Sequence, residues 1–77
     1  MKDLEAVRDY LATHTTPALH LYASLTVMHP GDVQVTAHLW GPSTTYFLSF
    51  PIEVFQHPEH VRREVEAFVG AAEHLAQ

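Results

Sequence analysis

Apolar positions near the start of the chain recur at helical spacing, which predicts a helix over residues 2–13. Three of them fall on one face of this helix: Leu4, Val7 and Leu11. Asp3 is expected in the first turn, where the positive end of the helix dipole favours an acidic side chain. The helix should end before Pro17, because the residue that precedes a proline avoids the helical conformation.

After this helix the apolar positions recur at every second residue, which is the spacing of half-buried strands. Three strands are predicted, over residues 19–28, 33–40 and 45–52. Residues 29–32 and 41–44 supply the turns between them. Pro51 has no backbone N–H to donate to a neighbouring strand, so the third strand should lie at an edge of the sheet. The second strand is then the central one.

A second helix is predicted from Pro58 onward, because proline is favoured at the first helical position. Apolar residues at spacings of three and four mark its buried face: Val61, Val65, Phe68, Ala72 and Leu75. Two ion pairs at i, i+4 spacing are expected on its outer face, Glu59 with Arg63 and Arg62 with Glu66.

Together these elements predict a single small α+β domain over residues 1–77, in the order α-β-β-β-α. We expect a three-stranded antiparallel meander with both helices packed on one face of the sheet. A chain of this size buries only about 60–65% of its unfolded surface, so the core of the domain should be thin.

The same order of elements occurs in double-stranded RNA-binding domains, and Gly41-Pro42 followed by Phe47 and Val54 resembles their second-hairpin region. Those domains contact the nucleic-acid backbone through a lysine-rich cluster at the start of the last helix. Residues 58–64 of this chain read Pro-Glu-His-Val-Arg-Arg-Glu, so that cluster is missing and RNA binding is not expected. The order also resembles the small, acidic, dimeric type III secretion chaperones, which continue with further strands and a helix that this chain lacks.

Charge is unevenly distributed along the sequence. There are 9 acidic residues, 4 basic residues, 7 histidines and no cysteine, with a formal net charge of −5. This balance argues against non-specific binding to nucleic acid or to an anionic membrane surface, which needs clustered lysine and arginine. Between Tyr10 and Ile52, Asp32 is the one formally charged residue. The sheet face that points away from the helices is therefore expected to be uncharged.

Aromatic and histidine side chains are expected to gather on this uncharged face. Matching like faces of the strands places Tyr22 near His38 and His38 near Phe47, with Trp40 and His20 within one or two rungs. A sheet face exposed to water normally carries Lys, Glu and Thr. The composition found here is typical of a face that another molecule covers.

Two kinds of partner fit such a face. The first is a second copy of the chain, which would stack on the face or join along the first strand, an edge without charge or proline. The second is another protein, of the kind bound by small acidic adaptors, chaperones and inhibitors. The sequence thus predicts a non-catalytic protein-interaction module, most simply a homodimer. The predicted partner-binding residues are His20, Tyr22, His38, Trp40 and Phe47.

Histidine is the outlier of the composition, and a histidine-based site for a divalent metal or a small ligand is the alternative function. His57 and His60, with Glu64 one turn further on, would present two imidazoles and a carboxylate to a metal ion. His20 and His38 would be directly or diagonally opposed on neighbouring strands. Neither arrangement matches an established metal motif, and a helix start and an interface explain them more simply. No metal or cofactor is therefore expected.

No signature of an enzyme is present in the sequence. It has no nucleophile elbow, phosphate-binding loop, dinucleotide fingerprint or cysteine nucleophile. It also shows no leader segment and no apolar run of membrane-spanning length. The expectation is a cytoplasmic protein that is not an enzyme and binds neither nucleic acid nor membranes.

Overall fold

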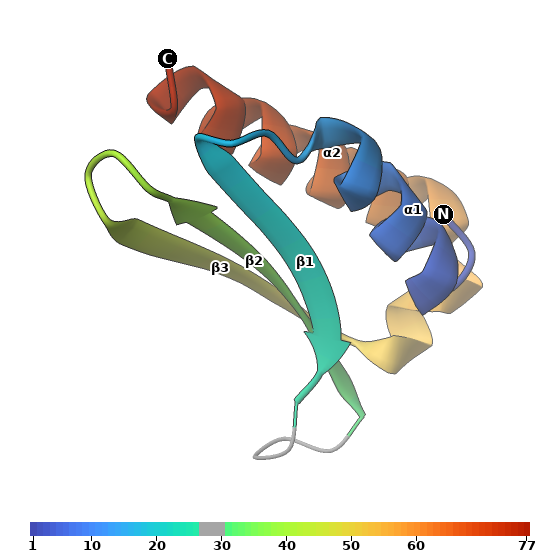
Figure 1. Ribbon diagram of the computed structural model, residues 1–77. Helices are drawn as coiled ribbons and strands as arrows, with labels where there is room; N and C mark the ends of the chain where they lie inside the picture. The colour runs from blue at the N-terminus through green and yellow to red at the C-terminus, as the bar shows by residue number, and fades with distance from the viewer. Residues whose placement is uncertain (27–30) are drawn as a thin grey trace.

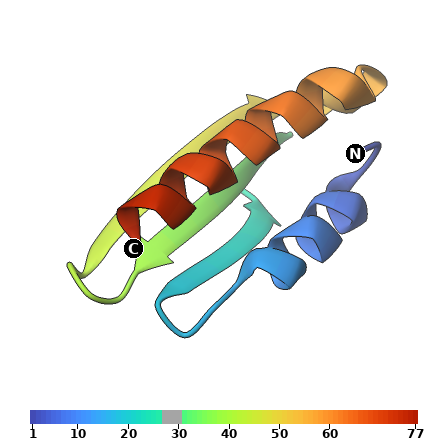
Figure 2. The same cartoon turned by 90° about the horizontal axis from the view of Figure 1, so that it is seen from above.

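The computed structural model describes residues 1–26 and 31–77 and confirms the α+β fold with element order α-β-β-β-α. The elements are α1 (Leu4–His14), β1 (Leu19–Leu25), β2 (Asp32–Leu39), β3 (Thr44–Pro51), the short 3₁₀ helix η1 (Ile52–Gln56) and α2 (Pro58–Leu75). Both helices lie on the same side of the sheet, as Figures 1 and 2 show, with α1 packed on β1 and α2 over β2 and β3. Within the described residues, no helix combines the length and apolarity needed to cross a bilayer.

Helix α1 begins two residues later than predicted because Asp3 caps it from outside. Asp3 has an extended backbone, with φ −157° and ψ 175°, and its carboxylate accepts a hydrogen bond of 2.8 Å from the N–H of Ala6. The capping side chain satisfies an N–H that has no partner within the helix. Asp3 therefore fixes where the helix starts, whereas the sequence pattern placed it within the first turn.

The sheet is an antiparallel meander in the order β1-β2-β3, which confirms β2 as the central strand and β3 as an edge strand. Pro51 is the last residue of β3, where its missing N–H interrupts no pairing. The described part of β1 ends at Leu25. Val27 and Met28, which were expected in this strand, lie outside the described residues, as do the first two residues of the predicted 29–32 turn.

The core lies between the helices and one face of the sheet. From the sheet it takes Leu19, Leu21, Ala23, Val33, Val35, Ala37, Leu39 and Phe50, and from the helices Val7, Leu11, Val61, Val65, Val69 and Ala72. The strand residues alternate in sequence and occupy matching positions in the register. The helical face of α1 is confirmed by the burial of Val7 and Leu11.

Helix α2 is rotated relative to its predicted orientation. Val69 occupies the core where Phe68 was expected, and Leu75 is 52% exposed rather than buried. Phe68 is only partly buried and, with Leu75, borders a groove beside Tyr46 of β3. The two apolar side chains thus overhang the β3 side of the sheet instead of filling the core.

The third strand has the predicted length but begins and ends one residue earlier than predicted, at Thr44 and Pro51, because η1 begins at Ile52. The N–H of Ile52 donates to the carbonyl of Gly31 over 2.7 Å, and Phe55 packs edge-to-face against Phe50 with ring centroids 5.7 Å apart. This turn carries the chain from the sheet edge to Pro58, where α2 begins as predicted.

The ion pairs on α2 are partly different from the predicted ones. Arg62 contacts Glu66 at 3.3 Å as expected, but Glu59 pairs with Arg62 at 2.6 Å rather than with Arg63. The hydrogen bond and the positive charge of Arg62 lower the pKa of Glu59. All these groups lie on the solvent side of the helix, far from the uncharged sheet face.

Candidate functional site

The sheet face that points away from the helices carries three rows of residues, one residue from each strand. The rows are His20–His38–Thr45, Tyr22–Thr36–Phe47 and Ser24–Gln34–Ser49. Trp40 follows β2 beyond the first row. We call these ten residues the open face. None of these ten residues carries a formal charge, as expected from the sequence. Asp32, which was expected in the turn, is instead the first residue of β2 and lies on the same face in the next row, opposite Pro51, so the uncharged part of the face ends there.

The register brings the predicted residues together, although not all as direct neighbours. His20 and His38 are directly opposed. Tyr22 and Phe47 both pair with Thr36, so each lies diagonal to His38 rather than opposite it. Diagonal neighbours remain within reach of aromatic side chains. The register therefore places the predicted residues of the three strands on one face, with Thr36 between Tyr22 and Phe47.

Thr36 is nearly inaccessible on a face that is otherwise exposed. It is 1% exposed, while Tyr22 and Phe47 on either side of it are 47% and 59% exposed. The two aromatic rings flank the small threonine side chain from the neighbouring strands. At the centre of the open face, the buried threonine therefore lies at the bottom of a depression between the two exposed aromatic side chains.

Imidazoles and aromatic rings are in contact at the Trp40 end of the face. The ring centroids of His38 and Trp40 lie 4.2 Å apart in a T-shaped arrangement, and those of His20 and Tyr22 lie 5.2 Å apart. The Nδ1 atom of His38 is 2.8 Å from the hydroxyl oxygen of Thr45. These contacts orient the side chains around a wide hollow of about 430 Å³. Trp40 remains 60% exposed.

The outer edge of β1 is covered over much of its length, contrary to the expectation of an unprotected edge. Thr16 and Leu19 form an isolated bridge, in which the N–H of Thr16 donates to the carbonyl of Leu19 at 2.9 Å and the N–H of Leu19 donates to the carbonyl of Thr16 at 3.1 Å. The hydroxyl of Thr15 accepts from the N–H of Leu21 and donates to its carbonyl, at 3.2 and 3.3 Å. Arg8 then donates from Nε to the carbonyl of Ala23 at 3.1 Å. Helix α1 and the loop after it thus occupy hydrogen-bonding groups that a second strand would need.

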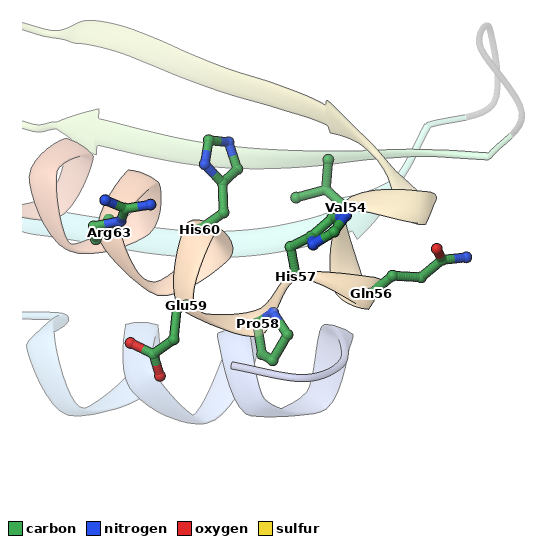
Figure 3. A pocket seen from close by; sticks show the side chains of 7 residues that line it. All are labelled: Val54, Gln56, His57, Pro58, Glu59, His60 and Arg63. Carbon is green, nitrogen blue, oxygen red and sulfur yellow. The ribbon is translucent and has the colours of Figure 1, made fainter.

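The alternative histidine site at the start of α2 is open and spread out. His57 and His60 line a hollow together with Glu59 and Arg63, and His60 also lines a neighbouring hollow beside β3 together with Glu64. In Figure 3 the Glu59 side chain extends to the opposite side of the ribbon from His60. Within residues 1–26 and 31–77, no three side chains of His, Cys, Asp or Glu form a group able to hold a metal ion.

One histidine contact was not predicted from the sequence. The Nδ1 atom of His14, at the end of α1, lies 3.1 Å from a carboxylate oxygen of Glu73 in α2, and Tyr10 packs against the His14 ring. Burial, and to a lesser extent the nearby carboxylates Glu66 and Glu73, raise the pKa of Tyr10. A contact between residues 59 positions apart leaves no periodic signal in the sequence.

Chemically, the open face offers aromatic surface, two imidazoles and several neutral hydrogen-bonding groups. Burial of these aromatic rings against a partner would remove apolar surface from water and so stabilise a complex. No family model, curated protein sequence or solved structure matches this chain, so its function has to be inferred from its own residues.

Proposed function

We propose that this protein is a non-catalytic protein-interaction module that self-associates by stacking the open faces of two copies. The observation that carries this proposal is the exposure of Trp40, Phe47 and Tyr22 among the ten uncharged residues of the open face, with Asp32 at its far end as the charged residue of β2. Aromatic residues are enriched at the centres of protein interfaces, and charged residues are depleted there. A cytoplasmic location, compatible with the cysteine-free composition, forms part of the proposal.

A second copy is the occupant that the composition of the face favours. The ten uncharged residues of two open faces meet without electrostatic repulsion, whereas most of the formal charges lie on the helices, on the far side of the sheet. Stacked sheets pack about 10 Å apart, which suits the interdigitation of aromatic side chains. Burial of the open face would also enlarge the thin core of a 77-residue chain.

The test is the oligomeric state of the purified chain. Sedimentation at high micromolar concentration should show an assembly larger than one chain. Replacement of His38 by aspartate should dissociate it, because a carboxylate would be buried opposite a neutral face. A monomer at high concentration would contradict the proposal. A monomer that is recovered from cells with one defined protein bound through Trp40 would instead favour an adaptor or inhibitor for that protein.

A histidine-based ligand site is the second candidate function, because His20 and His38 are directly opposed beside the hollow at Trp40. Two imidazoles alone leave a divalent ion with open coordination positions. Binding of zinc to the wild-type chain, lost when His38 is replaced by alanine, would support this candidate.

A further inference from the structure

The outer edge of β3 carries backbone groups that are available to another strand. The N–H of Trp40 donates to the carbonyl of Ala18, and the N–H of Thr26 donates to the carbonyl of Asp32. Every second residue of β2 between Asp32 and Trp40 therefore forms its backbone hydrogen bonds with β1. The remaining residues of β2 then bond to β3, which leaves the N–H and C=O groups of residues 45, 47 and 49 directed away from the sheet. Within the described part of the chain, these outward backbone groups have no hydrogen-bonding partner.

An apolar strip runs along the same edge on the helix side of the sheet. Tyr46 is 42% exposed and Leu48 is partly buried, and both point toward α2. Phe68 and Leu75 of α2 overhang this edge and border a groove of about 120 Å³ with Tyr46. No formally charged residue occurs between Thr44 and Pro51. The strand itself therefore lacks the charges that normally prevent strand pairing between molecules, and the charged residue nearest to it in a hollow on the helix side is Glu64 of α2.

We infer that β3 pairs antiparallel with β3 of a second copy about a two-fold axis at Phe47. In this register Phe47 lies opposite its own counterpart and Thr45 opposite Ser49, so all three outward-directed residues form bonded pairs. A shift toward the C-terminus pairs Thr45 with Pro51, which has no N–H. A shift toward the N-terminus uses Ser43, which lies in the turn with φ 56°. The register centred on Phe47 is the one that keeps every pair within the strand.

This pairing rests on the proposed self-association and extends it. The open face of three strands, each about seven residues long, has a projected area of about 350 Å², calculated from the usual spacing and rise of strands. Each partner in a specific complex buries about 800 Å² of accessible surface. The accessible surface of the open face exceeds its projected area because side chains protrude from it, but it is still small for a stable interface. Pairing of β3 strands gives a continuous six-stranded sheet and doubles the open face.

Two such six-stranded sheets, stacked through their open faces, form a tetramer with two distinct contacts. The edge contact joins the β3 strands, and the face contact buries Trp40 and Tyr22 together with their counterparts. Closed assemblies with perpendicular two-fold axes are common among soluble homo-oligomers. Phe47 takes part in both contacts, because it lies on β3 and on the open face.

Variants of the edge and of the face test this arrangement, and Tyr46→Glu is the edge variant that leaves all ten residues of the open face unchanged, whereas Ser49 belongs to both. Ser49→Pro removes an outward N–H from the edge, and Tyr46→Glu places a carboxylate in the apolar strip without altering the open face. Leu25→Glu is the matched control for Tyr46→Glu, since Leu25 is 52% exposed on the same side of the sheet but at the β1 edge. Trp40→Ala addresses the face contact.

The wild-type chain should sediment as a tetramer, and Ser49→Pro, Tyr46→Glu and Trp40→Ala should each give dimers. Leu25→Glu should stay tetrameric, and the combination of Ser49→Pro with Trp40→Ala should be monomeric. If Ser49→Pro does not fold, as judged by circular dichroism, the edge contact is tested by comparing the oligomeric state of Tyr46→Glu with that of Leu25→Glu.

The possible failures are distinguishable. A wild-type dimer that only Trp40→Ala dissociates would overturn the edge pairing and leave the proposed function standing. A wild-type dimer that only the two edge variants dissociate would support the edge pairing and overturn the face contact. A wild-type monomer, or a tetramer that Tyr46→Glu and Leu25→Glu affect equally, would overturn the edge pairing.

Discussion

Replacement of Trp40 by alanine should weaken self-association without loss of helix or strand content. The indole is 60% exposed in the single chain, and it contacts only the edge of the His38 ring on the open face. A tryptophan side chain presents up to about 250 Å², so roughly 150 Å² of it is available for burial by a partner. At about 25 cal/mol per Å², complete burial contributes at most about 4 kcal/mol for each copy.

Even half of this burial gives a large effect on association. A loss of about 2 kcal/mol in the free energy of association raises the dissociation constant roughly 30-fold. Sedimentation equilibrium over a range of concentrations measures this change, and circular dichroism monitors the fold. Leu25→Ala is the matched control, because Leu25 is 52% exposed but lies outside the open face. Identical association constants for the two variants would refute the assignment of the contact to the open face.

Two further predictions concern stability and metal. Asp3→Ala should lower the free energy of unfolding by about 1 kcal/mol, measured in urea, since the N–H of Ala6 loses its capping partner; an unchanged midpoint would mean that water replaces the carboxylate without cost. Zinc should leave the thermal midpoint unchanged if the histidines act only in the interface, whereas an increase that a chelator reverses would favour the metal site.

The pattern of apolar residues was sufficient for the architecture, because each element has a distinct period and a visible boundary. Pro58 marks the start of α2, and Pro51 identifies the edge strand. The helical periodicity was less informative about rotation. Phe68 and Val69 both fit a stripe with spacings of three and four, and the packing against the sheet selects the smaller valine.

The composition of the candidate site was also predictable, since an uncharged strand face is visible in the sequence alone. The arrangement of the residues within the site was not predictable, because the alternation of apolar and polar residues is the same whether two side chains on neighbouring strands are directly or diagonally opposed. The structure shows that Thr36, rather than His38, stands between Tyr22 and Phe47. The state of the two sheet edges was beyond the sequence altogether. It depends on where Arg8 and Thr15 come to lie after the helix folds back on β1.

Helix α1 and the loop that follows it cover the outer edge of β1 and thereby limit how far the protein could assemble. A sheet in which both edge strands have unpaired backbone groups can add molecules at both edges and grow into a fibre. Here one edge is occupied from within the same chain by Arg8, Thr15 and Thr16, so growth in the plane of the sheet stops once β3 is paired. In the proposed assembly, loss of the contacts made by these three residues would allow further copies to add at the β1 edge. Arg8 of α1 and the two threonines that follow the helix would then limit the size of the assembly, although they lie outside both of its contacts.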